Sequence, residues 1–450
     1  MNKIAPNAKA LISADERSRR YYLWTVGCQM NMADSARLEA ALQQVGYTPA
    51  SQPAEAGFIV LNSCSVRASA EQRVLGKLGD LQQIKRLYPA TQLVLWGCMV
   101  QPRENNASQA SKALLALVDH LVAPSAFEQV VALATTQTPL PSAVLPLRDP
   151  KNPPVSAYIP IQYGCNMTCS YCVIPARRGK ERSRPLLEIV TEAEQMLACG
   201  VKEIILLGQI VDSWGHDLAE RPTLADLLGA VHAIPNLVRL RFLTSHPRWL
   251  SEQLITTLAN LPRCQPEINL PLQTGHDAVL KLMRRGYTVA QYRALVAQIR
   301  LALPDVALTT DIIVGHPGET AEYFEQTLAL IKEIRFDKIH CAAFSARPGT
   351  LAAELELDPT LAVAEAEKET RRRTLDELQK ELLTESNARW LAKEVEVLVE
   401  DQVRGKWRGR TGQNKLVFFA HPAALKGQLV KVRITKTSPW ALQGEALLSS

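Results

Sequence analysis

Two kinds of apolar spacing alternate along the first third of the chain. Three stretches are continuous runs of apolar and β-branched residues, at 21–26, 58–62 and 92–96. The segments between them, such as Asp34 to Val45, repeat apolar residues every three or four positions, which predicts helices. Strands that are apolar throughout and alternate with helices are typical of a parallel sheet covered on both faces. We therefore predict a Rossmann- or flavodoxin-like α/β domain over residues 20–138.

A stretch with six prolines at residues 139–154 has little periodicity and predicts a stiff linker. The strand–helix alternation then resumes over residues 155–384. Apolar, β-branched runs recur there at 157–162, 203–207, 238–244, 267–272, 307–314 and 338–344. Six such units predict a partial (β/α)6 barrel of the TIM type, with its chemistry at the mouth formed by the C-terminal ends of the strands.

Short alternating strands separated by glycine-bearing turns over residues 385–450 predict a small antiparallel β-barrel. Positive charge concentrates here: residues 389–436 hold eleven Lys or Arg and four Asp or Glu, a balance of +7, whereas the whole chain has +6. A basic surface interleaved with aromatic rings favours nucleic acid, and RNA in particular. The alternative is a generic basic barrel with an aromatic core. The candidate RNA-binding residues are Lys406, Trp407, Arg408, Arg410, Lys415, Lys431 and Arg433.

Composition narrows the class of protein. The chain is 47% hydrophobic and 21% charged, as is usual for a globular protein in water. Its nine cysteines are an odd number in a long chain, which does not resemble a secreted disulfide scaffold. The first twenty residues lack the apolar segment of a signal peptide, and no stretch of about 18 apolar residues predicts a membrane span. We expect a cytoplasmic, reducing environment.

The strongest chemical signal is the C-x3-C-x2-C spacing of Cys165, Cys169 and Cys172. A structural zinc site draws four ligands from separated pairs, and no fourth Cys or His lies nearby. Three thiolates on one loop instead suit a cubane iron–sulfur cluster with one open iron. The amino and carboxylate groups of S-adenosylmethionine would fit that iron, and the spacing resembles the signature of radical S-adenosylmethionine enzymes. The alternative, three core cysteines in chance proximity, is much less favoured by this spacing.

Cys28, Cys64 and Cys98 each stand just beyond the end of one of the first three predicted strands. Because ligands bind at the C-terminal edge of an open α/β sheet, these distant cysteines are expected to converge. They predict a second metal cluster, again with three protein ligands. Three separately buried thiols remain the alternative.

Polar residues occupy the ends of the other barrel strands. Gln209, Ser245, Gln273 and Asp311 are candidate ligands for the adenosine, ribose and methionine carboxylate of the cofactor, and Arg184 is available for an anion. The alternative for each residue taken singly is ordinary turn chemistry.

At this point the chain resembles the methylthiotransferase family, and more closely its MiaB-type tRNA branch. The resemblance rests on segments spread over the chain: 27–31, 62–67, 97–101, 165–172, 183–185, 244–247, 311–320, 347–350 and 409–417. It implies that the barrel is a radical S-adenosylmethionine core and that the C-terminal barrel is a TRAM domain.

The resemblance further implies two 4Fe-4S clusters, S-adenosylmethionine and an enzyme that transfers alkylthio groups. Reductive cleavage of S-adenosylmethionine at the cluster on Cys165, Cys169 and Cys172 would give a 5′-deoxyadenosyl radical. This radical would abstract hydrogen from C2 of N6-dimethylallyladenosine beside the tRNA anticodon, and the second cluster would carry the sulfur. A flavodoxin or ferredoxin, a sulfide source and the tRNA anticodon stem-loop would be partners of a monomer.

The sequence departs from that branch at Ile210 and Asp212, where asparagines are usual, and at His276. It also departs at His316, where an aromatic residue is usual. These positions near the barrel mouth leave the choice of nucleoside open. Methylthiolation of threonylcarbamoyl-adenosine in tRNA or of a ribosomal-protein aspartate is the nearest alternative. A non-catalytic iron–sulfur protein that binds RNA and senses redox state is the alternative from another class.

Overall fold

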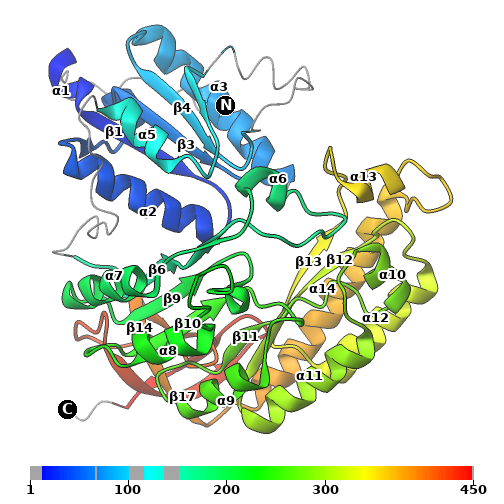
Figure 1. The fold of residues 1–450 in the computed structure, drawn as a ribbon. Helices are drawn as coiled ribbons and strands as arrows, with labels where there is room; N and C mark the ends of the chain where they lie inside the picture. Colours follow the sequence, from blue (N-terminus) through cyan, green and yellow to red (C-terminus); the bar gives the residue numbers. More distant parts are fainter. Residues whose placement is uncertain (1–12, 66–67, 101–115, 117, 136–151, 448–450) are drawn as a thin grey trace. The chain divides into compact units, whose positions relative to one another are not determined.

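The structure is a computed structural model that describes residues 13–65, 68–100, 116, 118–135 and 152–447. Most of the predicted linker, with part of the helical pattern before it, lies outside the described residues. The chain divides into two compact units (Figure 1). The first unit is Met1–Arg148 with Ala176–Gly179, and the second is Asp149–Pro175 with Lys180–Ser450. The boundaries of the three predicted domains stay predictions.

The first unit is built on a five-stranded parallel sheet of order β2-β1-β3-β4-β5. Its strands are β1 (Arg20–Thr25), β2 (Thr48–Pro49), β3 (Phe58–Ser63), β4 (Gln92–Gly97) and β5 (His120–Val122). Its helices are α1 (Ala14–Ser18), α2 (Gln29–Gln44), η1 (Pro53–Glu55), α3 (Ala68–Leu87) and α5 (Phe127–Ala134). The predicted parallel α/β domain is confirmed, and α2 starts earlier than the predicted helix.

Both faces of this sheet are buried, which explains why its strands are apolar throughout. On one face Phe58 and Val60 pack with Leu38 of α2, whereas on the other Ile59 and Leu61 pack with α3. Successive side chains of a strand point to opposite faces, so helices on both faces require an unbroken apolar run. All the strands point the same way, and the loops that carry the three cysteines therefore leave one edge.

The second unit contains the six strands of the partial barrel, in two parallel three-stranded sheets of order β10-β9-β6 and β11-β12-β13. They are β6 (Ser156–Pro160), β9 (Glu203–Leu207), β10 (Arg239–Leu243), β11 (Glu267–Asn269), β12 (Ala307–Val314) and β13 (Lys338–Ala343). The N–H of Ser245 donates to the carbonyl of Asn269 at 3.0 Å and links the two sheets. The curved sheet is the predicted partial barrel.

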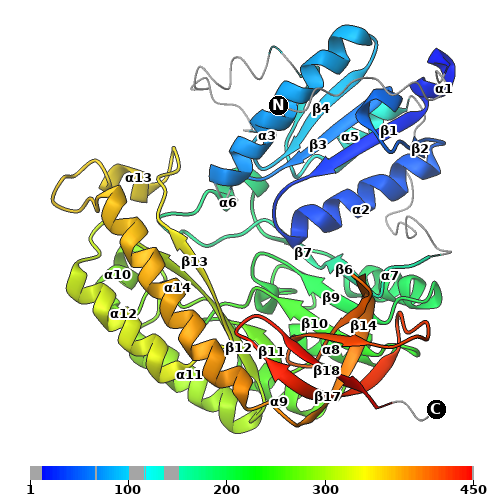
Figure 2. The same cartoon turned by 180° about the vertical axis from the view of Figure 1, so that it is seen from behind.

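Helices cover the outer face of this sheet (Figures 1 and 2). They are α7 (Leu186–Ala198), α8 (Leu224–His232), α9 (Glu252–Asn260), α11 (Val289–Ala302), α12 (Ala321–Ile334) and α14 (Glu365–Ala388). Short elements shape the loops: β7 (Gln162–Tyr163), α6 (Ile174–Arg178), β8 (Arg182–Ser183), η2 (Val211–Ser213), α10 (Asp277–Leu282) and α13 (Leu351–Leu355). None of the helices in the described ranges is long and apolar enough to cross a membrane.

The chain ends in a closed barrel of order β14-β15-β16-β18-β17 (Figure 2). Its strands are β14 (Glu394–Val403), β15 (Lys406–Arg410), β16 (Leu416–Ala420), β17 (Leu429–Thr437) and β18 (Leu442–Ala446). The β16–β18 pair is parallel, whereas we predicted an antiparallel barrel. An odd number of strands cannot alternate in direction around a closed ring, so one parallel pair is required.

This small barrel contacts the strand ends opposite the mouth of the larger one. Arg241, which pairs with Glu203 and Glu267 inside the larger barrel, donates to the carbonyl of Thr411 at 2.9 Å. The amide of Asn414 donates to Glu267 at 2.8 Å. Buried charged groups are tolerated when each has a partner. Here residues of the C-terminal barrel supply further hydrogen bonds to Arg241 and Glu267.

Candidate metal centres

The loop after β7 places the first cysteine triad at the mouth of the partial barrel. Cys165 is buried, and Cys169 and Cys172 are half-buried. The backbone N–H of Met167 donates to the sulfur of Cys165, and that of Ile174 to the sulfur of Cys172, both at 3.4 Å. Such N–H donors stabilise a thiolate in the way that they stabilise other anions.

Burial favours the protonated form of two thiols of this loop, those of Cys165 and Cys172. Burial raises the pKa of Cys172 to about 12, the N–H of Ile174 opposes the shift, and the sulfurs of Cys169 and Cys165 reinforce it. Burial likewise raises the pKa of Cys165. Three thiols close enough to repel one another as anions are a suitable donor set for iron, whose binding displaces the protons.

The far side of the loop is anchored to the end of α10 and to the loop that follows β12 in the same unit. The N–H of Ser170 donates to the carbonyl of Met283 at 3.1 Å, and the Ser170 hydroxyl lies 3.3 Å from Nε2 of His316. His316 Nδ1 lies 2.9 Å from the carbonyl of Pro317, so it carries the hydrogen and Nε2 accepts from Ser170. Burial lowers the pKa of His316 to about 4. The imidazole of His316 is therefore neutral.

Three buried polar atoms at the same barrel mouth have no hydrogen-bond partner in the described part of the chain. They are Ser245 Oγ and His246 Nε2, which follow β10, and Gln273 Oε1, which follows β11. Gln273 has a positive φ of 71°, and its N–H donates to the carbonyl of Asp311 at 2.8 Å. Buried polar atoms are almost always paired, so this group indicates a missing polar ligand.

His246 follows Ser245 after the end of β10 and is buried. Its Nδ1 accepts from the N–H of Arg248 at 3.2 Å, and burial lowers its pKa to about 3. The ring is therefore neutral, and Nε2 carries the hydrogen that lacks a partner. The Asp212 carboxylate accepts the backbone N–H of His246 at 3.0 Å. Asp212 thus supplies an acceptor oxygen, which an asparagine side chain could also supply.

The other predicted cofactor ligands have different surroundings. Gln209 is half-exposed just after β9, and the Asp311 carboxylate accepts from the amide of Asn269 at 3.2 Å. Arg184 is 6% exposed, donates to the carbonyl of Pro160 at 2.7 Å and pairs with Glu192 at 2.7 Å. These bonds favour a role for Arg184 in holding α7 against β6.

The second triad forms at the C-terminal edge of the sheet in the first unit. A Cβ added to Gly27 would lie 2.9 Å from the Cβ of Cys64, so the loop that bears Cys28 passes directly beside the next one. The N–H of Cys98 in turn donates to the carbonyl of Ser63 at 2.9 Å. Burial raises the pKa of Cys98, and the nearby Cys28 thiol contributes to the increase. The three predicted ligands therefore do meet at one edge.

Two buried asparagines join these loops. Nδ2 of Asn31 donates to Oδ1 of Asn62 at 2.8 Å and to the carbonyl of Ser63 at 3.1 Å. The Asn62 amide returns a bond to the carbonyl of Asn31 at 2.9 Å. Because the network satisfies these buried polar groups mutually, it fixes the relative position of the first two loops.

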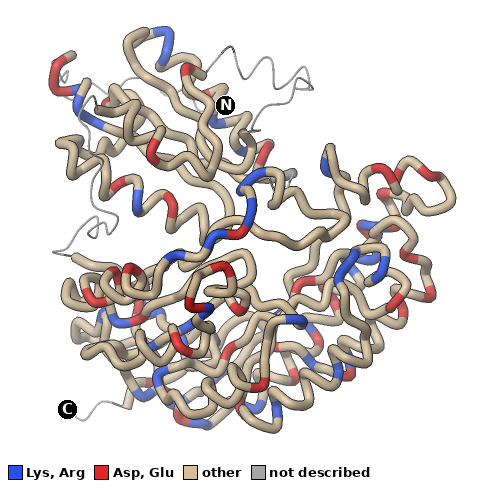
Figure 3. Tube along the Cα trace, in the orientation of Figure 1, with Lys and Arg blue, Asp and Glu red and all other residues tan. Residues whose placement is uncertain are grey.

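Arg178 lies beside the second triad, in the segment Ala176–Gly179 that belongs to the first unit. Its guanidinium makes two bonds of 3.1 Å to one oxygen of Asp34. Burial lowers the pKa of Arg178, but the carboxylate of Asp34 and the thiols of Cys98 and Cys28 outweigh it, so the net shift is upward. Arg178 belongs to the basic run from α6 to β8 (Figure 3).

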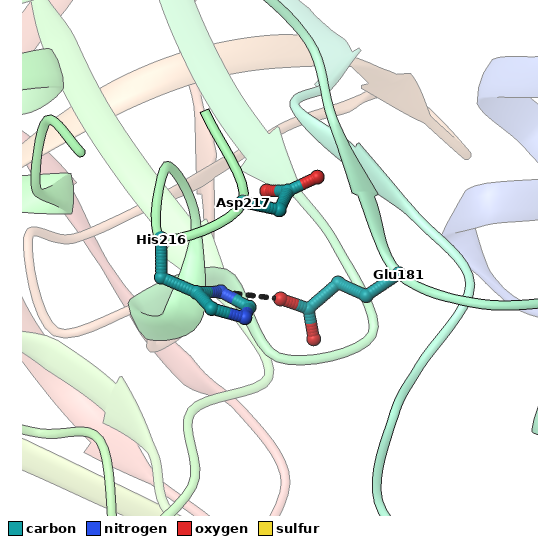
Figure 4. Close-up of side chains that lie close together, drawn as sticks. All are labelled: Glu181, His216 and Asp217. Atoms are coloured by element: carbon teal, nitrogen blue, oxygen red, sulfur yellow. Dashed lines mark ion pairs between the residues drawn. The ribbon is translucent and has the colours of Figure 1, made fainter. Parts of the chain in front are cut away.

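A further acidic cluster follows the loop of the first triad. Nδ1 of His216 lies 2.7 Å from Glu181, and Asp217 stands nearby (Figure 4). Their ligand atoms lie within 4.8 Å of one another, a spacing that suits a metal ion. However, the ion pair and a 3.0 Å bond from the N–H of Ser183 to Asp217 already engage these groups. We interpret the cluster as support for the loop, because the N–H of Glu181 donates to the side chain of Asn166.

Most of the predicted RNA-binding residues have partners within the protein. Trp407 is 7% exposed in the core of the C-terminal barrel. The ion pairs are Arg408–Asp401 at 2.5 Å, Arg410–Glu400 at 3.1 Å, Lys415–Asp337 at 2.9 Å and Arg433–Glu394 at 2.8 Å. Lys406 and Lys431 are exposed and form no ion pair with described residues. Trp440 of the same barrel is 58% exposed.

Comparison with family models identifies the class. The model of the Radical SAM superfamily matches residues 159–331, that of the uncharacterized protein family UPF0004 matches 20–119, and that of the TRAM domain matches 391–447. A solved structure of the radical S-adenosylmethionine methyltransferase TsrM from Kitasatospora setae shares the fold, with a TM-score of 0.54 and 17% identity over 74% of this chain and 75% of that chain. The fold and the cysteine loop thus define a radical S-adenosylmethionine protein with a TRAM domain. An iron–sulfur cluster and S-adenosylmethionine are the cofactors of this class.

Sequence relatives identify the family. The chain is 66% identical over 429 residues to the tRNA-2-methylthio-N(6)-dimethylallyladenosine synthase of Chloroflexus aurantiacus, covering 95% of this chain and 91% of the relative. Proteins of the same name from a Roseiflexus species and from Herpetosiphon aurantiacus are 62% and 58% identical, covering 96% and 95% of this chain and 90% and 97% of their own lengths. The chain belongs to the family of tRNA-2-methylthio-N(6)-dimethylallyladenosine synthases.

Proposed function

We propose that this protein inserts a methylthio group at C2 of N6-dimethylallyladenosine next to the anticodon of tRNA. The observation that carries the proposal is the loop of Cys165, Cys169 and Cys172 at a barrel mouth whose buried polar atoms lack partners. The relatives at 58–66% identity support the choice of substrate. An aromatic C–H bond is unreactive toward bases at neutral pH, so this substitution requires radical chemistry.

The three cysteines of the loop would bind a 4Fe-4S cluster, and the N–H groups of Met167 and Ile174 would stabilise their sulfurs. One-electron reduction of such a cluster supplies the cleavage of S-adenosylmethionine that generates the radical. Ser245, Gln273, Gln209 and Asp311 would bind and orient this cofactor. The two buried oxygens of Ser245 and Gln273 that lack partners are the strongest support for that assignment.

We propose a second 4Fe-4S cluster on Cys28, Cys64 and Cys98, which would hold the sulfur to be transferred. The convergence of the three loops at one sheet edge supports this proposal. Three cysteines leave one iron without a protein ligand, which gives the sulfur a binding position.

The proposed partners are the anticodon stem-loop of tRNA, a flavodoxin or ferredoxin that donates electrons, and a source of sulfide. Lys406, Lys431 and Trp440 are the residues of the TRAM barrel best exposed for phosphate contact and base stacking. The paired arginines of the same barrel would contribute less, because their charge is partly neutralised. A cytoplasmic monomer is consistent with these roles.

The test is anaerobic reconstitution followed by incubation with dithionite, S-adenosylmethionine and dimethylallylated tRNA. We expect 5′-deoxyadenosine and the 2-methylthio nucleoside, identified by mass analysis of digested tRNA. Cys169→Ala abolishes both products, and Cys64→Ala abolishes the nucleoside. Cys199→Ala, outside both triads, is the matched control and retains both.

Two results would contradict parts of the proposal. Formation of 5′-deoxyadenosine without the modified nucleoside would support a radical enzyme that acts on another substrate. Threonylcarbamoylated tRNA would then be tested next. Neither product from protein that holds both clusters would overturn the enzymatic function and favour a redox-sensing RNA-binding protein.

A further inference from the structure

Arg285 is a buried cation beside the first cysteine triad. Only 5% of its surface is exposed, and its Nη1 donates to the sulfur of Cys169 at 3.3 Å. Its Nε donates to the hydroxyl of Tyr287 at 3.3 Å. Throughout the described part of the chain, no acidic side chain forms an ion pair with this guanidinium.

Tyr287 is not the missing counter-charge. Its hydroxyl is within donating distance of two carbonyl oxygens, that of Pro271 at 3.0 Å and that of Leu272 at 2.9 Å. Burial raises the pKa of Tyr287, so the phenol is neutral at physiological pH. A buried cation without an anion is strongly unfavourable, and arginine keeps its charge in proteins. The hydrogen bond to Cys169 therefore indicates where the anion lies.

The second triad shows the contrasting arrangement. Arg178 is as deeply buried as Arg285, at 5% exposure, and it also lies beside cysteine sulfurs. Its charge, however, is balanced by Asp34. One arginine thus adds a net positive charge next to its triad, and the other forms part of a neutral pair.

We propose that Arg285 is a positioning residue that supplies the permanent counter-charge of the cluster on Cys165, Cys169 and Cys172 and raises its reduction potential. This inference rests on the proposed presence of that cluster. Three thiolates and a 4Fe-4S core carry a net negative charge that grows by one on reduction. A fixed positive charge in a buried site favours the more negative, reduced state. Reduction is the step that begins the proposed reaction.

The experiment measures the midpoint potential of the loop cluster in the full-length chain without S-adenosylmethionine, by electron paramagnetic resonance at controlled potentials. Cys28→Ala/Cys98→Ala removes the second centre, so the signal comes from the loop. Arg285→Met removes the charge, and Arg285→Lys retains it. Arg284→Met, which removes the charge of the exposed neighbour, is the matched control because exposed charges are screened.

For Arg285→Met we expect at least a tenfold fall in the equilibrium constant for one-electron reduction, which is about 59 mV toward negative potential. Arg285→Lys recovers most of the shift, and Arg284→Met shows none. Arg285→Gln keeps a hydrogen-bond donor near Cys169 without the charge. It is expected to match Arg285→Met, and it replaces that variant if Arg285→Met does not retain iron.

An unchanged potential in Arg285→Gln or Arg285→Met, with iron still bound, would overturn the proposal. An unchanged potential with a weakened dissociation constant for S-adenosylmethionine would also overturn it and assign Arg285 to the carboxylate of that cofactor. Failure of the proposed function is distinguishable, because that function is measured by the formation of 5′-deoxyadenosine and the methylthio nucleoside, whereas this proposal is measured by the midpoint potential of the loop cluster.

Discussion

The first triad lies within eight residues of one loop and is called the loop triad below (Cys165, Cys169 and Cys172). The second triad comes from the ends of three strands that span about seventy residues and is called the strand-end triad (Cys28, Cys64 and Cys98). The first triad needs only the local path of one loop, which backbone bonds from residues such as Ser170 hold in place. The second exists only when the parallel sheet has formed and its loops are in register. The comparison teaches that similar donor sets are produced by local spacing in one case and by topology in the other.

The two triads also differ in the charged residues that surround them. At the strand-end triad the buried charges of Arg178 and Asp34 are paired. Near the loop triad, neither the buried Arg285 nor the buried Asp212 forms an ion pair with a side chain in the described part of the chain. Unpaired buried charges cost stability and mark positions where a ligand or a reaction uses them.

The largest expected effect comes from breaking the paired arrangement. Asp34→Asn leaves the buried Arg178 without a carboxylate, and it should lower the free energy of unfolding of the metal-free protein by about 3–5 kcal/mol. The measurement is urea unfolding before and after reconstitution. A cluster on the strand-end triad supplies negative charge to Arg178, so the loss should be smaller in the reconstituted protein.

Glu333→Gln is the control for this prediction. It breaks the Arg293–Glu333 pair, whose side chains are 48% and 52% exposed, and surface pairs contribute about 1 kcal/mol or less. An equal loss for Asp34→Asn with and without the cluster would show that the charge of Arg178 does not act on the triad.

The second prediction concerns the unpaired acid. Burial raises the pKa of Asp212 from 3.8 to about 7, with the N–H of His246 opposing the shift. Between these values the folded state binds the proton and the unfolded state does not, so stability falls as pH rises from about 4 to 7. At pH 8 the cost is on the order of 4 kcal/mol. Asp212→Asn, which keeps an oxygen acceptor for His246, should remove it.

Urea midpoints at pH 5 and pH 8 check this expectation. Asp212→Asn should stabilise the protein more at pH 8 than at pH 5. The exposed Asp305→Asn is the control, and its difference between the two pH values should equal that of the unaltered protein. If Asp212→Asn retains the full decline of the unaltered protein, another group is responsible for it.

The sequence predicts the fold and the approach of the cysteine-bearing loops to one another, because both depend on spacing. Apolar runs mark each strand, and the strand-end cysteines follow once a parallel sheet is inferred. The partners of charged residues depend instead on side chains distant in sequence. Arg178, 144 residues from Asp34, illustrates this limit.

The C-terminal barrel shows the same limit at single residues. Trp407 stands among basic residues and is expected from the sequence to stack on bases. It is a core residue instead, because alternate side chains of its strand point into the barrel. The pairing of Lys415 with Asp337 is likewise invisible in a count of charges. Which ring nitrogen of His246 is free for a ligand is equally invisible in the sequence, and only the contact with Arg248 reveals it.

The smallest expected change in stability comes from Gly27→Ala, a substitution beside the strand-end triad. Gly27 has φ of 146°, and an added Cβ would approach Asn31 Oδ1 to 2.5 Å and the Cβ of Cys64 to 2.9 Å. Gly27→Ala must therefore separate the first two loops, at a cost of about 1–3 kcal/mol. We expect loss of the strand-end cluster and hence about half of the bound iron, since each proposed cluster holds the same number of irons.

Iron analysis and the electron paramagnetic resonance signal of the loop cluster distinguish the outcomes. Gly79→Ala in α3, where a Cβ meets no atom within 4 Å, is the matched control and should keep all the iron with equal or slightly greater stability. Loss of both clusters in Gly27→Ala would show that the loop triad also depends on the sheet. Retention of both would show that the close approach of Gly27 to Cys64 is not what assembles the second centre. Loss of the strand-end cluster alone would separate topology from local spacing as the origin of the two sites.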